Sequence, residues 1–123
     1  MTDAPKDASA GTGEVAAAIS NAVVKLMAEY TGRGPTRART TLAEEHVTVV
    51  LTDTLTKGER SLVRDGKVDQ VLSMRYAFQQ TMRDELVTAV ETLSGRTVTA
   101  FMSANHTDPD VAVEFFLTHQ PGS

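Results

Sequence analysis

The sequence has no cysteine, no long apolar run and few aromatic residues, which make up 5% of its 123 residues. Without cysteine, disulfides, thiolate nucleophiles and zinc–thiolate sites are all excluded. No stretch approaches the roughly 20 consecutive apolar residues that a membrane-spanning helix needs. The N-terminus lacks the basic segment and apolar run of a secretory signal. We therefore expect a soluble, cytoplasmic protein that does not insert into a membrane, although it could contact a membrane protein peripherally.

The charge balance disfavours nucleic acid as a partner. The chain has 12 Lys and Arg residues against 16 Asp and Glu residues, for a net charge of −4. Non-specific nucleic-acid binding depends on a basic field that this composition does not provide. A chain of 123 residues is long enough for one domain with a single modest core.

We expect this domain to occupy residues 14–119. Residues 1–13, MTDAPKDASAGTG, have few side chains that a core could bury. Such a composition cannot offset the entropy lost on ordering, so a disordered tail is predicted there. Residues 120–123 are predicted to form a short frayed tail.

Two segments have apolar residues at the spacing of an amphipathic helix. In the first, which starts at Glu14, the side chains of Ile19, Val23 and Met27 share one face. The second, residues 68–94, contains no proline or glycine and is the longest predicted element. At about 1.5 Å per residue it would be roughly 40 Å long, which exceeds the diameter of so small a domain. It should therefore either bend or pack one end on something else.

Four segments are typical of β-strands. Residues 36–42 alternate loosely and residues 46–52 are rich in β-branched side chains, so the two are predicted to form an antiparallel hairpin. Residues 97–104 and 111–118 form a second predicted pair. The polar residues 105–110 between them are predicted to form its turn.

A short helix is expected between the first hairpin and the long helix. Thr56 and Glu59 have capping-box spacing, and the helix should continue to about Arg64. The element order predicts a two-layer α+β domain. Its mostly antiparallel four-stranded sheet, made of two hairpins, would be covered by the first helix, the short helix and the long helix. Two hairpins can join a sheet in more than one way, so the strand order is left open.

Three segments together resemble one family. They are GRGP at residues 32–35, LTKGERSLV at residues 55–63 and MRYAFQQTMRDELVTAVETLSGRTV at residues 74–98. They resemble the MpsC-like proteins, which are named after a component of a proposed sodium-translocating, membrane-potential-generating system. The likeness covers about residues 15–117, while residues 105–110 depart from the usual family pattern.

This resemblance implies a cytoplasmic accessory role beside membrane machinery for ion or inorganic-carbon uptake, including bicarbonate transport. It implies no reaction, because the family has no established catalytic residues to map onto this chain. Because residues 105–110 depart from the family pattern, the resemblance implies no role for them.

Three arginines after the first helix are candidate anion ligands. Arg33, Arg37 and Arg39 lie near glycines that could expose backbone amides to phosphate or bicarbonate. Gly32-Arg33-Gly34 does not match a dinucleotide or Walker motif, which needs a strand before the glycines and a helix after them. An ordinary helix cap followed by a solvated strand is the other interpretation.

His106, Asp108 and Asp110 offer an imidazole and two carboxylates that could bind a divalent ion or exchange protons. Residues of these types are also what a hairpin turn uses, and the spacing lacks the further ligands of a calcium loop. We therefore favour a turn and predict no metal and no cofactor.

Four residues are candidates for an interface: Arg75, Phe78, Met82 and Phe116. Arg75 lies on the apolar stripe of the long helix, so it must pair with a carboxylate, reach solvent or face a partner, and we favour a pair within the domain. Residues 115–117 are Phe-Phe-Leu, which puts apolar side chains on both faces of one strand. Either the chain covers both faces, or the outer face meets another subunit.

No catalytic constellation stands out. His46 and His119 are at strand ends, and no serine lies in a GxSxG motif. We predict a non-enzymatic accessory or regulatory domain that acts through protein–protein contacts and forms a homodimer. The alternative is a small-anion sensor that uses the arginines after the first helix. A third class, an enzyme of unknown chemistry, stays open.

Overall fold

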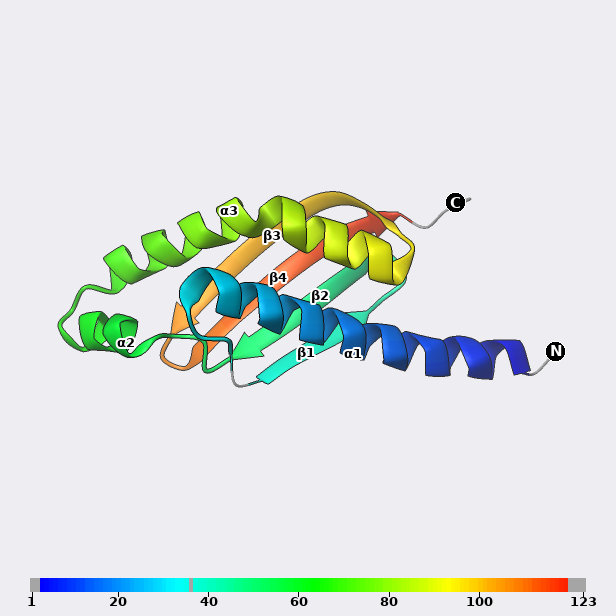
Figure 1. The fold of residues 1–123 in the computed structure, drawn as a ribbon, viewed down its shortest axis with the longest axis horizontal. Coiled ribbons are helices and arrows are strands. Elements are labelled where there is room, and N and C mark those ends of the chain that lie inside the picture. The colour runs from blue at the N-terminus through cyan, green and yellow to red at the C-terminus, as the bar shows by residue number, and fades with distance from the viewer. Residues whose placement is uncertain (1–2, 36, 120–123) are drawn as a thin grey trace.

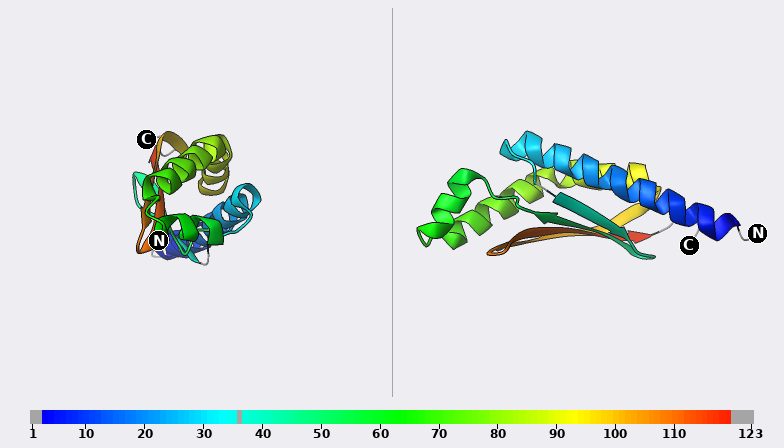
Figure 2. Two further views of the ribbon diagram at one scale, coloured as in Figure 1. Left: turned by 90° about the vertical axis from the view of Figure 1, so that its left-hand side faces the viewer. Right: turned by 90° about the horizontal axis from the view of Figure 1, so that it is seen from below.

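The computed structural model describes the backbone of residues 3–35 and 37–119. The described residues form three helices and one four-stranded sheet. Figure 1 shows these elements in two layers, and Figure 2 shows that the helices lie on one side of the sheet. This arrangement confirms the predicted α+β fold. In chain order the elements are α1 (Asp3–Thr31), β1 (Arg37–Leu42), β2 (His46–Thr52), α2 (Lys57–Arg64), α3 (Val68–Ser94), β3 (Thr97–Thr107) and β4 (Asp110–His119).

The sheet has the strand order β1-β2-β4-β3, and all three strand pairs are antiparallel. Both predicted hairpins form, and the pairing of β2 with β4 joins them. Val50 of β2 is directly opposite Val113 of β4. The central strand β2 is rich in β-branched side chains, as expected for a strand with a neighbour on each side.

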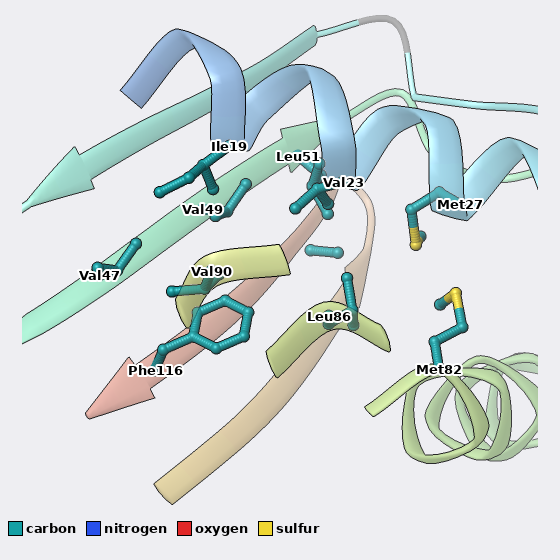
Figure 3. Close-up of a cluster of buried hydrophobic side chains, with 11 residues drawn as sticks. Ile19, Val23, Met27, Val47, Val49, Leu51, Met82, Leu86, Val90 and Phe116 are labelled. Atoms are coloured by element: carbon teal, nitrogen blue, oxygen red, sulfur yellow. The ribbon is translucent and has the colours of Figure 1, made fainter. Parts of the chain in front are cut away.

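The core lies between the helices and the inner face of the sheet. α1 and α3 each contribute side chains four residues apart, which lie on the same face of a helix. β2 and β4 contribute alternate residues, since successive strand side chains point to opposite faces. Fully burying an aliphatic or aromatic side chain is worth about 1.5–3 kcal/mol. Figure 3 shows this cluster, which contains Ile19, Val23, Met27, Val47, Val49, Leu51, Met82, Leu86, Val90, Ala112 and Phe116.

The two helices that follow the first hairpin begin and end as predicted. The Thr56 side chain accepts from the Glu59 N–H at 3.1 Å and the Glu59 carboxylate accepts from the Thr56 N–H at 2.8 Å, which is the expected capping box. α3 is unbroken and ends at Gly95, whose φ of 73° is readily adopted by glycine. The N-terminal part of α3 extends past the sheet and packs against α2 (Figure 1).

The beginning of α1 differs from the prediction. The helix starts at Asp3, whereas the composition of residues 1–13 predicts a disordered tail and a helix from Glu14. Alanine, which is frequent in this segment, is the strongest helix former. Pro5 lies in the first turn, where its missing N–H costs no intrahelical hydrogen bond. The predicted frayed tail at residues 120–123 is outside the described residues.

The second hairpin is longer than predicted. Residues 105–107, expected in the turn, continue the ladder of β3, with Asn105 opposite Ala112 and Thr107 opposite Asp110. The turn is reduced to Asp108 and Pro109. Polar residues are compatible with this position because β3 is an edge strand, with one side open to solvent.

Candidate functional site

The three arginines after α1 do not converge in the structure. Arg33 points toward the segment after β2, where its Nη1 donates to the carbonyl oxygen of Asp53 at 2.6 Å and its Nη2 donates to the Asp53 carboxylate at 3.1 Å. Arg37 and Arg39 instead point away from the core, on the exposed positions of β1. The structure therefore separates Arg33 from Arg37 and Arg39, so the three arginines do not form the single anion site that the sequence suggests.

Arg37 and Arg39 border a hollow of about 330 Å³ whose other lining residues are Val50 and Thr52. Both arginines are exposed, and neither forms an ion pair or hydrogen bond with another described residue. The register places Arg39 beside Val50 and Arg37 beside Thr52. The hollow thus combines two unpaired guanidinium groups with a partly apolar floor.

This hollow is part of the outer face, by which we mean the face of the sheet that carries no helix (Figure 2). Rows of side chains cross it in register, and the middle of the face is apolar. Met102 is 54% exposed and Leu117 is 40% exposed, which is high for large apolar side chains. The apolar residues at outward positions are Val50, Ala100, Met102, Ala104, Val111, Val113, Phe115 and Leu117.

The charge of the outer face differs from that of the whole protein. The chain has a net charge of −4. Yet the outward-pointing positions of the described strands contain Arg37, Arg39 and three histidines, and no Asp or Glu. The outer face is therefore an apolar surface with a cationic border along β1.

The four residues predicted at an interface lie inside the domain. Met82 and Phe116 have no exposed surface, and Arg75 is only 3% exposed. Phe78 is partly buried and packs against the core. This prediction is corrected, because alternation along β4 directs Phe116 inward and its neighbours outward. Of the two interpretations of residues 115–117, the one in which the chain covers both faces of β4 does not hold for the described residues, which leave its outer side uncovered.

Arg75 forms the buried pair that the sequence favoured. Its Nη1 donates to Glu59 Oε1 at 2.9 Å, and both side chains are almost completely buried. Glu59 is thus shared between the α2 cap and α3. A buried pair of this kind is strongly destabilising to break, because the remaining charge is left without a partner. Arg75 and Glu59 therefore have a structural role, in holding α2 against α3.

A second buried polar group, Glu114, lies between α3 and the sheet. Gln79 Nε2 donates to Glu114 Oε2 at 2.8 Å, and the Ser103 hydroxyl donates to Glu114 Oε1. Asn105 and Gln79 also pair through their amides, with distances of 2.8 and 3.2 Å. Burial raises the pKa of Glu114 to about 7, although the hydrogen bonds from Ser103 and Gln79 and the charge of Arg75 oppose this shift.

The groups of the β3–β4 turn are used in local contacts. His106 Nδ1 lies 2.8 Å from the carbonyl oxygen of Pro109. Asp110 accepts from the Thr54 hydroxyl at 2.9 Å and from the Leu55 N–H at 2.9 Å. Among the described residues, no group of three or more His, Cys, Asp and Glu side chains is placed to hold a metal ion.

Comparison with known proteins gives the family. Residues 11–120 match the family model described as "Na+-translocating membrane potential-generating system (MpsC)". The chain belongs to the MpsC family. The match covers nearly the whole chain and includes all of residues 15–117, over which the sequence resembles the family. No curated protein and no solved structure matched the chain. Within the described part of this MpsC chain, the helices are all too short or too polar to cross a membrane.

Sequence reasoning missed two groups of residues in this MpsC domain. Gln79 lies in the buried stripe of α3, four residues after Arg75, so its position was predictable but its partner Glu114 was not. The second group is the basic side chains of α2. Lys57, Arg60 and Arg64 have the spacing of one helix face, a signal that is visible in the sequence once α2 is assigned.

Proposed function

We propose that this MpsC protein is a non-enzymatic accessory domain that binds a membrane-associated protein through its outer face, on the cytoplasmic side of an ion or inorganic-carbon transport system. The observation that carries the proposal is the apolar surface on the outer face, which the described chain leaves without a covering layer. Monomeric soluble proteins rarely expose a contiguous apolar surface of this kind without a partner. The family description supplies the membrane setting.

The chemistry of the outer face restricts the partner. Arg37 and Arg39 border the apolar surface, and no carboxylate lies on the described outward positions to neutralise them. Interfaces match opposite potentials, which speeds association and excludes wrong partners. The partner should therefore present an apolar surface bordered by Asp or Glu side chains.

The structural use of the polar groups supports the non-enzymatic part of the proposal. Asp110, Glu59 and Glu114, which could act as acids or bases, are all engaged in hydrogen bonds that hold elements of the fold together. Surface recognition needs none of them. The homodimer stays a prediction, and self-association through the outer face would show as a doubled mass of the purified protein.

Site-specific photo-crosslinking in the native host tests this proposal. A photoreactive amino acid replaces Met102 on the outer face, or Tyr76, which is 53% exposed on α3, as the matched control. We expect one membrane-associated protein to be linked from position 102 and not from position 76. The crosslink should be lost when Arg37→Glu and Arg39→Glu are added, because the charge match is reversed. Equal crosslinking from both positions, or a crosslink that ignores the arginine changes, would refute the proposal.

A further inference from the structure

A second pocket lies between the end of α1, the segment after β2 and helix α2. It has a volume of about 400 Å³ and is open to solvent. Its lining is dominated by basic side chains, with one carboxylate among them. We call it the α2 pocket; its lining residues are Arg33, Asp53, Leu55, Lys57, Arg60 and Arg64.

The fold brings these basic residues together from two places in the chain. Lys57, Arg60 and Arg64 recur at three- and four-residue intervals along α2, so they share one helix face. Arg33 reaches the same place from the end of α1. Gly32 makes this possible because its φ of 81° turns the chain out of the helix.

Asp53 holds two of the four cations in place. Its carboxylate pairs with Arg33 at 3.1 Å and forms a close ion pair with Arg60. Arg60 Nε also donates to the carbonyl oxygen of Leu55 at 3.3 Å. Asp53 has a φ of 57°, a left-handed conformation that costs energy for a residue other than glycine. The surrounding contacts thus keep Asp53 in a strained conformation that orients both guanidinium groups.

The other two cations of the pocket have no such structural role. Lys57 and Arg64 form no ion pair or hydrogen bond with any described residue. Both are exposed, and they face the same pocket as the oriented arginines. Asp110 lies 3.7 Å from Arg60, so the basic side chains of the pocket outnumber the nearby carboxylates Asp53 and Asp110, on a protein whose net charge is −4.

We propose that the α2 pocket binds a phosphate group, either as free phosphate or as a phosphate ester. Guanidinium groups match the oxygen geometry of phosphate, and a lysine adds a mobile point charge. Two oriented arginines with two unpaired cations beside them favour a doubly charged anion over a singly charged one, because each added charge strengthens the attraction. The outer face is not involved, so this proposal and the proposed docking role can fail independently.

Titration calorimetry on the full chain at low ionic strength tests the α2 pocket, with inorganic phosphate in one arm and glycerol 3-phosphate in the other. We expect a dissociation constant of about 0.1–1 mM for at least one of them. The double variant Lys57→Gln/Arg64→Gln should weaken binding by at least about tenfold, because it removes the unpaired cations and leaves the Asp53 ion pairs intact. Tighter binding of the ester would identify an organic phosphate as the ligand, and tighter binding of phosphate would identify the free ion.

The matched control is Lys25→Gln/Arg83→Gln, which makes the same change in net charge at exposed positions outside the pocket. This control should bind as the unmodified protein does, and Lys57→Arg should also retain binding because it keeps the charge. Equal loss in both double variants would reduce the effect to non-specific electrostatics and overturn the proposal. So would the absence of binding to both ligands at millimolar concentration. Circular dichroism checks that every variant is folded.

Discussion

Gln79 of α3 donates a hydrogen bond to the fully buried carboxyl group of Glu114 on β4, over 2.8 Å. This contact ties the long helix to the centre of the sheet through a group that can gain or lose a proton. Burial raises the pKa of Glu114 from its usual 4.5 to about 7. The stability of the domain should therefore depend on pH.

The first prediction concerns this dependence. The pKa of Glu114 is higher in the folded protein than in the unfolded chain, so the folded protein holds this proton more tightly. The resulting contribution to the free energy of unfolding is complete below pH 4.5. It is lost as the pH rises from 4.5 through 7. At about 1.4 kcal/mol per pKa unit, the free energy of unfolding should fall by about 3 kcal/mol across this range.

Glu114→Gln isolates that contribution. The amide oxygen can accept from Gln79 and the amide nitrogen can donate to Ser103, so the contacts survive without a titrating group. In urea denaturation, the variant should be close to the unmodified protein at pH 4.5 and more stable by about 3 kcal/mol at pH 8. Glu29→Gln, an exposed change, is the control. A difference between Glu114→Gln and the unmodified protein that is constant with pH would contradict the prediction.

The second prediction concerns the buried ion pair of Arg75 with Glu59. Arg75→Met keeps a side chain of similar length but leaves the Glu59 carboxylate buried without its cation. Breaking a buried pair in this way costs about 3–5 kcal/mol, which urea denaturation at pH 7 measures. Arg83→Met, on the exposed side of the same helix, should change stability by less than about 0.5 kcal/mol. Equal effects of the two changes would show that the Arg75 pair contributes little.

The third prediction compares two adjacent phenylalanines of β4. Phe116 has no exposed surface and lies in the core, so Phe116→Ala should destabilise the domain by about 3–5 kcal/mol. Phe115 lies on the outer face, where it stacks near His46 with ring centroids 5.1 Å apart. Phe115→Ala should cost only about 1 kcal/mol. Thermal unfolding of both variants measures the two losses of stability. A larger loss for Phe115→Ala than for Phe116→Ala would contradict the finding that Phe116 is on the face of the sheet that the helices cover.

The fourth prediction concerns the cap of α2. Thr56→Ala removes the hydroxyl that accepts from the Glu59 N–H and should destabilise the domain by about 1 kcal/mol. Thr56→Ser keeps the hydroxyl and should remain within about 0.5 kcal/mol of the unmodified protein. Urea denaturation separates the two. A serine variant as unstable as the alanine variant would mean that the methyl group, not the cap, is what matters.

Much of the fold was predictable because its signals are local. The four-residue spacing of Ile19, Val23 and Met27, the capping box at Thr56 and the unbroken helix up to Gly95 each depend on neighbours in the chain. The length of the second hairpin was not predictable from local signals, since polar residues suit both a turn and an edge strand. Only the pairing of Asn105 with Ala112 decided between them.

The candidate sites were less predictable, because they depend on contacts between distant residues. The sequence selected Arg33, Arg37 and Arg39 as one group, but Arg33 turns to Asp53 while the other two lie on the outer face. In the same way, Phe116 was proposed for an interface, and its burial follows from which face of β4 the helices cover.

By itself, the amino-acid sequence determined the family, the fold class and the extent of most helices and strands, since periodicity, caps and turn residues act over a few positions. Only the tertiary structure decided the strand order, the burial of Glu114 and the separation of the arginines. Each of these depends on which face of an element meets another element, and residues far apart in the chain set that choice together.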